Sequence, residues 1–234
     1  MKKILHVIST LNGQNSYSMA LGNKILEQLK KEYPENEVVE RNLVAEDFPH
    51  ITEDKWQAII TPEENRTEEQ KETIAFQDEV INELFDADIL VIGAPLYNFG
   101  IPSQLKAWID HLAKSGVTFK YTEEGPQGLV SGKKVYIAMS SGGVYSENPA
   151  YDFVSDYLIK IFGFLGMTDV ELIRVEGIAI PELRDGALDK PSIKDNFGAI
   201  LYQGVIKEAL ILARIVNHHR ALLMDDMTTE RDFT

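Results

Sequence analysis

Hydrophobic runs alternate with stretches of helical spacing along most of the chain. The runs are continuous or nearly continuous, as expected of parallel strands buried on both faces, and they fall at residues 4–9, 89–92, 134–139 and 171–175. A further strand, nearer an edge of the sheet, is expected at residues 37–42. This order predicts an α/β fold in which a doubly wound, five-stranded parallel sheet, ordered 2-1-3-4-5, carries helices on both faces.

Apolar residues recur at helical spacing between these strands. The stretches are residues 21–29, 74–85, 105–112 and 153–165. Two start signals stand out: Thr67 begins a capping box, and Asn148-Pro149 reads as an N-cap followed by the first helical residue. The pattern is helical again from residue 192 to about residue 222. We therefore expect a single domain over residues 1–234, ending in a helical extension and tail from about residue 181.

Composition narrows the classes of function. A net charge of −14 argues against nucleic-acid and anionic-membrane partners, because both require a basic surface. The absence of cysteine excludes disulfides and thiolate chemistry, and the histidines lack the spacing of a metal site, so no metal is expected. No apolar stretch approaches the roughly twenty residues that span a bilayer. His6 and Ser9 interrupt the apolar run at the start, which favours a first strand over a signal peptide and predicts a cytoplasmic protein.

Three loops would meet at the carboxyl edge of this sheet, where open α/β sheets bind ligands. Residues 9–18 carry hydroxyl and amide side chains but no Lys or Arg. A phosphate monoester there would be held by hydroxyls, backbone N–H groups and the start of the next helix, which Ser16 or Ser18 can cap. Residues 96–100 include two rings, an amide and a glycine, which favour a flat ligand, and residues 140–145 include two adjacent glycines. Together these loops fit flavin mononucleotide (FMN).

Four blocks of sequence carry a resemblance to a known family. They are residues 94–110 (APLYNFGIPSQLKAWID), 116–129 (GVTFKYTEEGPQGL), 140–143 (SSGG) and 163–169 (GFLGMTD). Over roughly residues 1–178 the chain resembles the FMN-dependent NADH-azoreductase family. The resemblance implies a flavodoxin-like homodimer with FMN at the subunit interface. It also implies an enzyme that reduces quinones and azo compounds with NADH or NADPH as the electron donor.

The resemblance also implies roles for individual residues, carried over by position. The phosphate would be held by Thr10, Ser16, Tyr17 and Ser18. The isoalloxazine and ribityl groups would lie on Leu96, Tyr97, Asn98 and Phe99, and the pyrimidine end on Ser140, Ser141, Gly142 and Gly143. The substrate pocket above the flavin would be lined by Phe119, Tyr121 and Phe164. Ser141 stands where members of the family often carry Arg, which leaves the preference between NADH and NADPH open.

The expected reaction is ping-pong hydride transfer through the flavin, in which donor and acceptor use one pocket in turn. No side chain has to be a nucleophile, and no catalytic acid or base is assigned; Tyr121 is the candidate for a proton relay. Two alternatives stay open. One is a flavodoxin-like electron-transfer module without a small-molecule substrate, which the acidic charge would suit. The other is a hydrolase built on Ser140 and Ser141 with Asp110-His111, although the G-x-S-x-G elbow is missing.

Overall fold

Six strands form the main sheet, in the order β2-β1-β3-β6-β7-β8. Their bounds are β1 Lys3–Ile8, β2 Glu37–Asn42, β3 Ile89–Pro95, β6 Lys134–Ser140, β7 Asp169–Val175 and β8 Ser192–Asp195. The first five run parallel, so the predicted order 2-1-3-4-5 is confirmed, with the strand at residues 37–42 at an edge.

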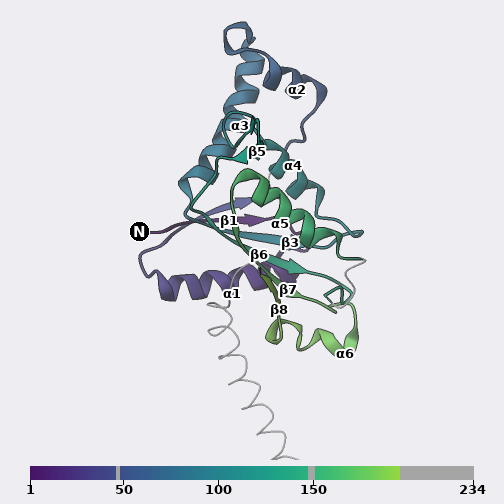
Figure 1. Ribbon diagram of the computed structural model, residues 1–234. Helices are drawn as coiled ribbons and strands as arrows, with labels where there is room; N and C mark the ends of the chain where they lie inside the picture. Colours follow the sequence, from purple (N-terminus) through teal and green to yellow (C-terminus); the bar gives the residue numbers. More distant parts are fainter. Residues whose placement is uncertain (46–47, 147–150, 196–234) are drawn as a thin grey trace, which may run out of the picture. The chain divides into compact units, whose positions relative to one another are not determined.

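The structure is a computed structural model that describes residues 1–45, 48–146 and 151–195 (Figure 1). The chain divides into compact units of residues 1–197 and 198–234, and the second unit lies outside the described residues. The expected single domain and most of the expected C-terminal helical extension therefore stay predictions.

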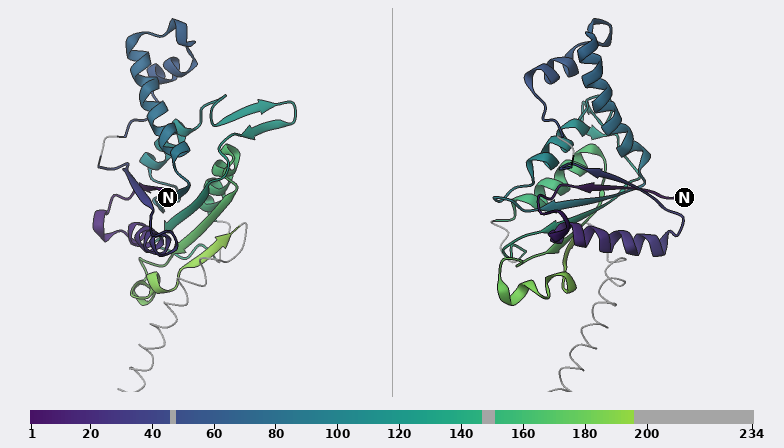
Figure 2. Two further views of the ribbon diagram at one scale, coloured as in Figure 1. Left: turned by 90° about the vertical axis from the view of Figure 1, so that its left-hand side faces the viewer. Right: turned by 180° about the vertical axis from the view of Figure 1, so that it is seen from behind.

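Helices cover both faces of the sheet (Figure 1, Figure 2). One face carries α1 (Tyr17–Glu32), and the other carries α3 (Glu68–Asp86), α4 (Ser103–Leu112) and α5 (Phe153–Leu165). The shorter elements are α2 (Glu53–Ile60), which packs on α3, and α6 (Pro181–Arg184). A separate hairpin of β4 (Phe119–Thr122) and β5 (Gly125–Gly128) stands away from the sheet in the left-hand view of Figure 2.

One prediction was wrong at the end of the sheet. The sequence pattern predicts a helix from residue 192, but Ser192–Asp195 is β8, which pairs antiparallel with β7 and sets Ile193 opposite Ile173. Without β8, the outer side of β7 would present unpaired backbone N–H and C=O groups. Strand pairing supplies those partners, and helical periodicity does not register this long-range requirement. The rest of the expected helix lies outside the described residues.

Two of the helix starts that the sequence predicts are confirmed. Ser16 is the N-cap of α1, and Thr67 forms the predicted capping box at the start of α3. Residues 148–149, where a helix start was expected, lie outside the described residues. The helix that follows begins instead at Phe153, with Asp152 as its N-cap.

The larger part of the core lies between the sheet and the helices α3, α4 and α5. Trp108 of α4 and Phe162 of α5 are among the largest fully buried side chains, and they pack with Leu90 of β3 and Ile137 of β6 in one cluster. Truncating a buried Trp or Phe to Ala typically costs about 3–5 kcal/mol, so these contacts hold α4 and α5 firmly on the strands. The loops at the carboxyl ends of β3 and β6 are thereby fixed on a rigid support.

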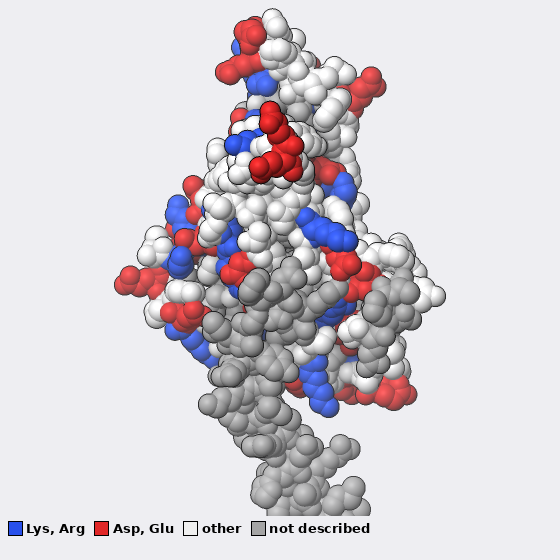
Figure 3. All heavy atoms as spheres, viewed as in Figure 1, with Lys and Arg blue, Asp and Glu red and all other residues white. Residues whose placement is uncertain are grey.

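The described surface mixes charges of both signs. On the face drawn in Figure 3, Lys and Arg side chains are scattered among Asp and Glu rather than gathered in one area. Within the described ranges, no helix has the length and apolar character needed to cross a membrane.

Candidate functional site

The first loop carries buried hydroxyl groups beside the start of α1. Ser16 and Ser18 are 5% and 1% exposed, and their Oγ atoms lie 3.0 Å apart. The Oγ of Ser16 accepts a hydrogen bond from the N–H of Met19 at 3.3 Å, which makes Ser16 the helix cap. The N–H groups of the first turn, including that of Tyr17, have no partner within the helix, as at any helix N-terminus.

The charge of this loop suits a phosphate that is bound by neutral donors. Residues 9–18 contain no Lys or Arg. The N-terminus of a helix nevertheless acts as roughly half a positive charge, and its free N–H groups point toward a ligand. Buried hydroxyls beside such a terminus are a donor set that phosphate oxygens can accept. The residues therefore fit the phosphate group of the predicted cofactor.

The turn after β3 has a strained backbone. Tyr97 and Gly100 exchange two backbone hydrogen bonds of 2.9 Å, and between them Asn98 (φ 50°) and Phe99 (φ 61°) both adopt the left-handed conformation. Asn tolerates this region, but for a bulky residue such as Phe it costs roughly 1–2 kcal/mol. Strain of this kind gathers at binding sites, where the surrounding structure maintains it. The turn leaves the ring of Phe99 half exposed at the carboxyl edge of the sheet.

Tyr97 joins this turn to the first loop. Its hydroxyl lies 3.3 Å from Oγ1 of Thr10 and accepts a hydrogen bond from the N–H of Leu11 at 3.2 Å. Thr10 is buried, and its Oγ1 also accepts from the N–H of Asn12 at 3.2 Å. The end of β1 is thereby tied to the end of β3. This junction is the crevice at which a sheet of this strand order binds its ligand.

The loop after β6 lies directly beside the turn after β3. The N–H of Leu96 donates to the carbonyl of Ser140 at 2.7 Å. The N–H of Ser141 donates to the carbonyl of Val175 at 3.0 Å, and its Oγ donates to the carbonyl of Gly143 at 2.9 Å. The structure thus brings together two of the predicted ligand-binding groups, one after each strand.

The two glycines of the third loop are required by close neighbours. A Cβ atom at Gly142 would lie 3.3 Å from the Cβ of Ala179, and one at Gly143 would lie 3.2 Å from the ring of Tyr145. Both distances are tighter than ordinary van der Waals contact. Glycine is the residue that fits these close approaches, and the role of the pair toward a ligand stays a prediction.

The three predicted pocket residues form one aromatic group. The ring of Phe119 on β4 lies 4.7 Å from the ring of Phe164 on α5 and 5.7 Å from that of Tyr121. Tyr121 is 73% exposed. The structure therefore brings Phe119, Tyr121 and Phe164 together, as predicted, at the base of the hairpin. Their role toward a substrate stays a prediction.

The structure gives no support to a hydrolase. His111 of α4 is 1% exposed, so it is a buried residue of the core rather than a polar residue open to solvent. Its ring packs edge-on against Phe48 and Phe76 at 5.6 and 5.3 Å, and burial lowers its pKa. The hydroxyl of Ser141 donates to the backbone of its own loop. Among the residues that the structure describes, no group of three His, Cys, Asp or Glu could hold a metal ion.

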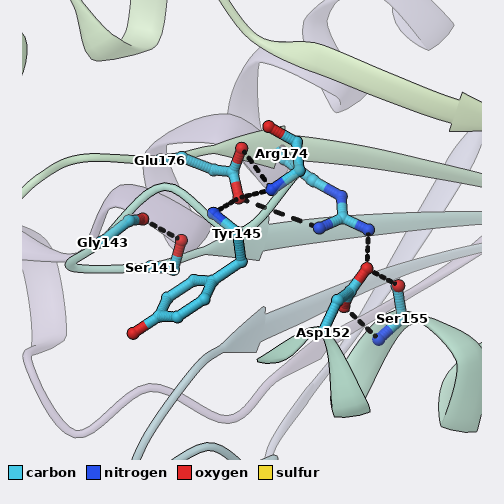
Figure 4. A network of polar contacts seen from close by, with 8 residues as sticks. Ser141, Gly143, Tyr145, Asp152, Ser155, Arg174 and Glu176 are labelled. Atoms are coloured by element: carbon cyan, nitrogen blue, oxygen red, sulfur yellow. Dashed lines mark hydrogen bonds and ion pairs between the residues drawn. The ribbon is translucent and has the colours of Figure 1, made fainter. Parts of the chain in front are cut away.

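A buried charged network, which was not predicted from the sequence, contacts the third loop (Figure 4). Arg174 of β7 has a side chain that is 2% exposed, and its Nη2 lies 2.5 Å from Oδ2 of Asp152. Its Nη1 lies 3.8 Å from Oε1 of Glu176. The signal was present in the sequence, because a charged residue in a strand that is buried on both faces requires a partner.

Comparison with known proteins gives a consistent result. Residues 2–193 match the family described as having a flavodoxin-like fold. An FMN-dependent NADH:quinone oxidoreductase of Herminiimonas arsenicoxydans is 49% identical over 182 residues, which are 77% of this chain and 89% of the relative. Another, from Mesorhizobium japonicum, is 45% identical over 194 residues, 82% of this chain and 92% of the relative.

Solved structures agree with these relatives. The azoreductase from Bacillus anthracis str. Sterne is 32% identical and has a TM-score of 0.73, covering 92% of this chain and 98% of its own. An FMN-dependent NADH-azoreductase from Bacillus anthracis str. Ames Ancestor, crystallised in complex with FMN, is 27% identical with a TM-score of 0.74; the match covers 91% of this chain and 100% of the other.

Proposed function

The chain belongs to the flavodoxin-like family of FMN-dependent NADH:quinone oxidoreductases, and from this membership we propose that it reduces quinones and azo compounds with electrons from NADH. NADPH is the alternative donor, and the Ser at position 141, where members of the family often carry Arg, leaves the preference between the two donors open. When bound, FMN supplies two-electron transfer from the nicotinamide to the acceptor. Donor and acceptor would occupy one pocket in turn, in ping-pong order, and cleavage of an azo bond to two amines would take two rounds.

Three groups of residues would hold the cofactor. The phosphate would bind at Thr10, Ser16, Tyr17 and Ser18. The isoalloxazine and ribityl groups would lie against Leu96, Tyr97, Asn98 and Phe99, and the pyrimidine end against Ser140, Ser141, Gly142 and Gly143. The chemistry of each group supports this assignment: hydroxyls and a helix N-terminus for an anion, rings for a flat heterocycle, and open backbone for polar ring atoms.

The observation that carries the proposal is the junction of these groups at one crevice. The Tyr97 hydroxyl contacts Thr10 at 3.3 Å, and the N–H of Leu96 donates to Ser140 at 2.7 Å. A single ligand can therefore reach a phosphate-type site and a ring-type site across the ends of three neighbouring strands. FMN has those two parts in one molecule.

The remaining residues would shape the pocket. Phe119, Tyr121 and Phe164 would line the space above the flavin and exclude water from it. The hydroxyl of Tyr121 is the candidate for holding a proton that the acceptor needs. If Tyr121 acts only through packing, Tyr121→Phe keeps kcat and its pH profile; a loss of kcat of roughly tenfold or more would establish the relay.

The enzyme would act as a cytoplasmic homodimer with the flavin site at the subunit interface. Exposed apolar side chains support an interface, since Trp56 and Ile60 on α2 are each about half exposed. Sedimentation of the purified full chain with FMN tests the assembly. A mass of two chains is expected, and a single-chain mass would contradict it.

Steady-state kinetics test the activity. NADH oxidation by the FMN-loaded protein is measured while a benzoquinone is varied at several fixed NADH concentrations. The proposal expects turnover that depends on the quinone and parallel lines in double-reciprocal plots. Bound FMN with little quinone-dependent turnover would identify an electron-transfer module instead, and converging lines would contradict the ping-pong order.

A further inference from the structure

One guanidinium joins both ends of the loop after β6 (Figure 4). The loop begins at residue 141, and α5 starts at Phe153 with Asp152 as its N-cap. Arg174 lies beneath the loop on β7. Its Nη2 contacts Asp152 at the far end of the loop at 2.5 Å, and its Nη1 lies 3.8 Å from Glu176, whose carboxylate holds the near end.

Glu176 binds the backbone of the loop directly. Its Oε1 accepts hydrogen bonds from the N–H groups of Tyr145 and Ser146 at 2.8 and 3.0 Å. The Glu176 side chain is 8% exposed, so the carboxylate itself is largely buried. Charge-assisted bonds of this kind are stronger than neutral ones. They fix the loop two to three residues after the glycine pair.

Asp152 fixes the other end. Its carboxylate accepts hydrogen bonds from the N–H of Ser155, at 3.2 Å, and from the hydroxyl of the same residue. Burial by itself raises the pKa of Asp152, but the hydrogen bonds from Ser155 and Arg174 outweigh burial and lower the pKa below its usual value. Asp152 is thus a carboxylate that caps α5 and is paired with Arg174.

Two tyrosines in the described parts of the loop after β6 contact the strained turn after β3. The ring of Tyr145 lies edge-on to that of Phe99, with 6.1 Å between centroids, and the ring of Tyr151 lies 6.2 Å from it. Phe99 holds a left-handed backbone conformation that its surroundings must maintain. A shift of the loop would therefore move both the Gly142-Gly143 backbone and the ring contacts of Phe99.

Burying an arginine between two carboxylates in a strand has a large desolvation cost in free energy. The desolvation of buried ions commonly equals or exceeds their attraction, and well-packed apolar side chains are often as stable or more stable. On the same face of β7, Leu172 is fully buried in the core cluster, so an apolar residue would suit position 174 on packing grounds. Net stability over an apolar alternative therefore does not explain this network, although breaking it by removing one partner would be destabilising.

We propose that Arg174, through Glu176 and Asp152, is a positioning residue that sets the geometry of the loop binding the pyrimidine end of the flavin. The proposal rests on the function proposed above. Arg174 touches neither cofactor nor substrate in this account. It acts on them through the backbone of residues 141–146.

The test compares two buried arginines in the full chain. Arg174→Met removes the clamp that Arg174 forms with Glu176 and Asp152. Arg41→Met removes an arginine of β2 that is paired with Glu79 and Glu83 of α3, at the opposite edge of the sheet from β7. Both variants leave two carboxylates without their arginine, so both are expected to lose stability. Three quantities are measured: the Kd of FMN for the apoprotein, the KM for NADH, and the hydrogen exchange of the Tyr145 and Ser146 amides without flavin.

For Arg174→Met we expect a roughly tenfold or larger rise in the Kd of FMN, a rise in KM for NADH and faster exchange of both amides, as for loss of one member of a coupled network. Arg41→Met should change none of the three. Arg174→Lys should restore part of the affinity. Glu176→Gln, which keeps its size, should speed exchange of the same amides even if Arg174→Met does not fold.

Equal FMN affinity and equal amide exchange in Arg174→Met and Arg41→Met would overturn the proposal and leave Arg174 a purely structural residue. If the wild-type chain bound no FMN, the proposed function would fail instead. Amide exchange would still report on the clamp in that case, because that measurement contains no flavin.

Discussion

The two ends of the same parallel strands are built in opposite ways. At the amino edge, charges are paired with one another: Lys2 lies 3.2 Å from Asp88, and Lys134 lies 2.7 Å from Asp169 and 3.4 Å from Glu171. At the carboxyl edge, the loops hold buried hydroxyls, a left-handed Phe and a buried arginine network. At the amino edge, the polar groups pair with each other, whereas at the carboxyl edge the fold holds hydroxyls and backbone groups in place for a ligand. Polar groups therefore indicate function where the fold positions them and still leaves them able to bind a ligand.

The largest effect is expected from a carboxylate placed among the hydroxyls of the carboxyl edge. Ser18→Asp suits a helix N-terminus electrostatically, so α1 should tolerate it. The new charge would repel the phosphate of FMN, and we expect the Kd to rise by about a hundredfold, which corresponds to about 3 kcal/mol. Titration of the apoprotein with FMN measures the change.

The matched control adds the same kind of charge at the other edge. Thr168 is exposed just before β7, near the amino ends of the strands. Thr168→Glu should leave the Kd of FMN unchanged. Equal FMN affinities in Ser18→Asp and the wild type would show that the phosphate of FMN does not bind at the first loop.

The next effect concerns His6, which lies between the two edges on β1. It is 2% exposed, and burial lowers its pKa from 6.5 to about 4. Between these two pH values, the unfolded chain therefore binds more protons than the folded chain. The contribution of His6 to the free energy of unfolding is complete above pH 6.5 and is lost as the pH falls toward 4. The loss should reach up to about 3 kcal/mol.

Urea unfolding of the wild type and of His6→Asn at pH 7 and pH 4.5 measures this loss. Carboxylates titrate in both proteins, so the difference between the two isolates His6. The wild type should lose more stability than the variant between these two pH values. An equal loss would show that the buried imidazole does not govern stability in this range.

A smaller effect is expected at the hairpin that carries the predicted pocket rings. A Cβ atom at Gly128 would lie 2.2 Å from the backbone N of Gly166, so Gly128→Ala must push the hairpin away from the end of α5. We expect a loss of about 1–3 kcal/mol in stability, together with a higher KM for the quinone as Phe119 leaves Phe164. Gly163→Ala is the control, since its Cβ would meet no atom within 4 Å. An unchanged KM for the quinone in Gly128→Ala would show that the hairpin does not line the substrate site.

The smallest effect is expected at the amino edge itself. Lys2→Ala removes a pair in which both side chains are over a third exposed, and such pairs contribute about 0–1 kcal/mol. The free energy of unfolding should fall by no more than this, and FMN affinity and turnover should not change. A clear loss of FMN affinity would mean that the two edges are not functionally distinct.

The sequence predicts features that depend on near neighbours. The capping box at Thr67 and the Ser16 cap are confirmed, because each depends on residues within one turn. The parallel strand order is also confirmed, because a succession of strands and helices with right-handed crossovers allows few orders. The loops after β1, β3 and β6 were placed correctly for the same reason, since parallel strands end at a common edge.

Features that depend on distant pairing were missed. The Arg174 contact with Asp152 spans 22 positions, and β8 forms only because β7 needs a partner. The burial of His111 depends on Phe48 and Phe76, which come from separate segments. The left-handed conformation of Phe99 had no local signal, because most sequences avoid a bulky residue there.

The most direct test of the account is the visible absorption spectrum of the purified full chain, with identification of the chromophore that denaturation releases. The account predicts flavin absorption bands and release of FMN in a ratio of about one per chain. A colourless protein that also fails to bind added FMN would contradict it.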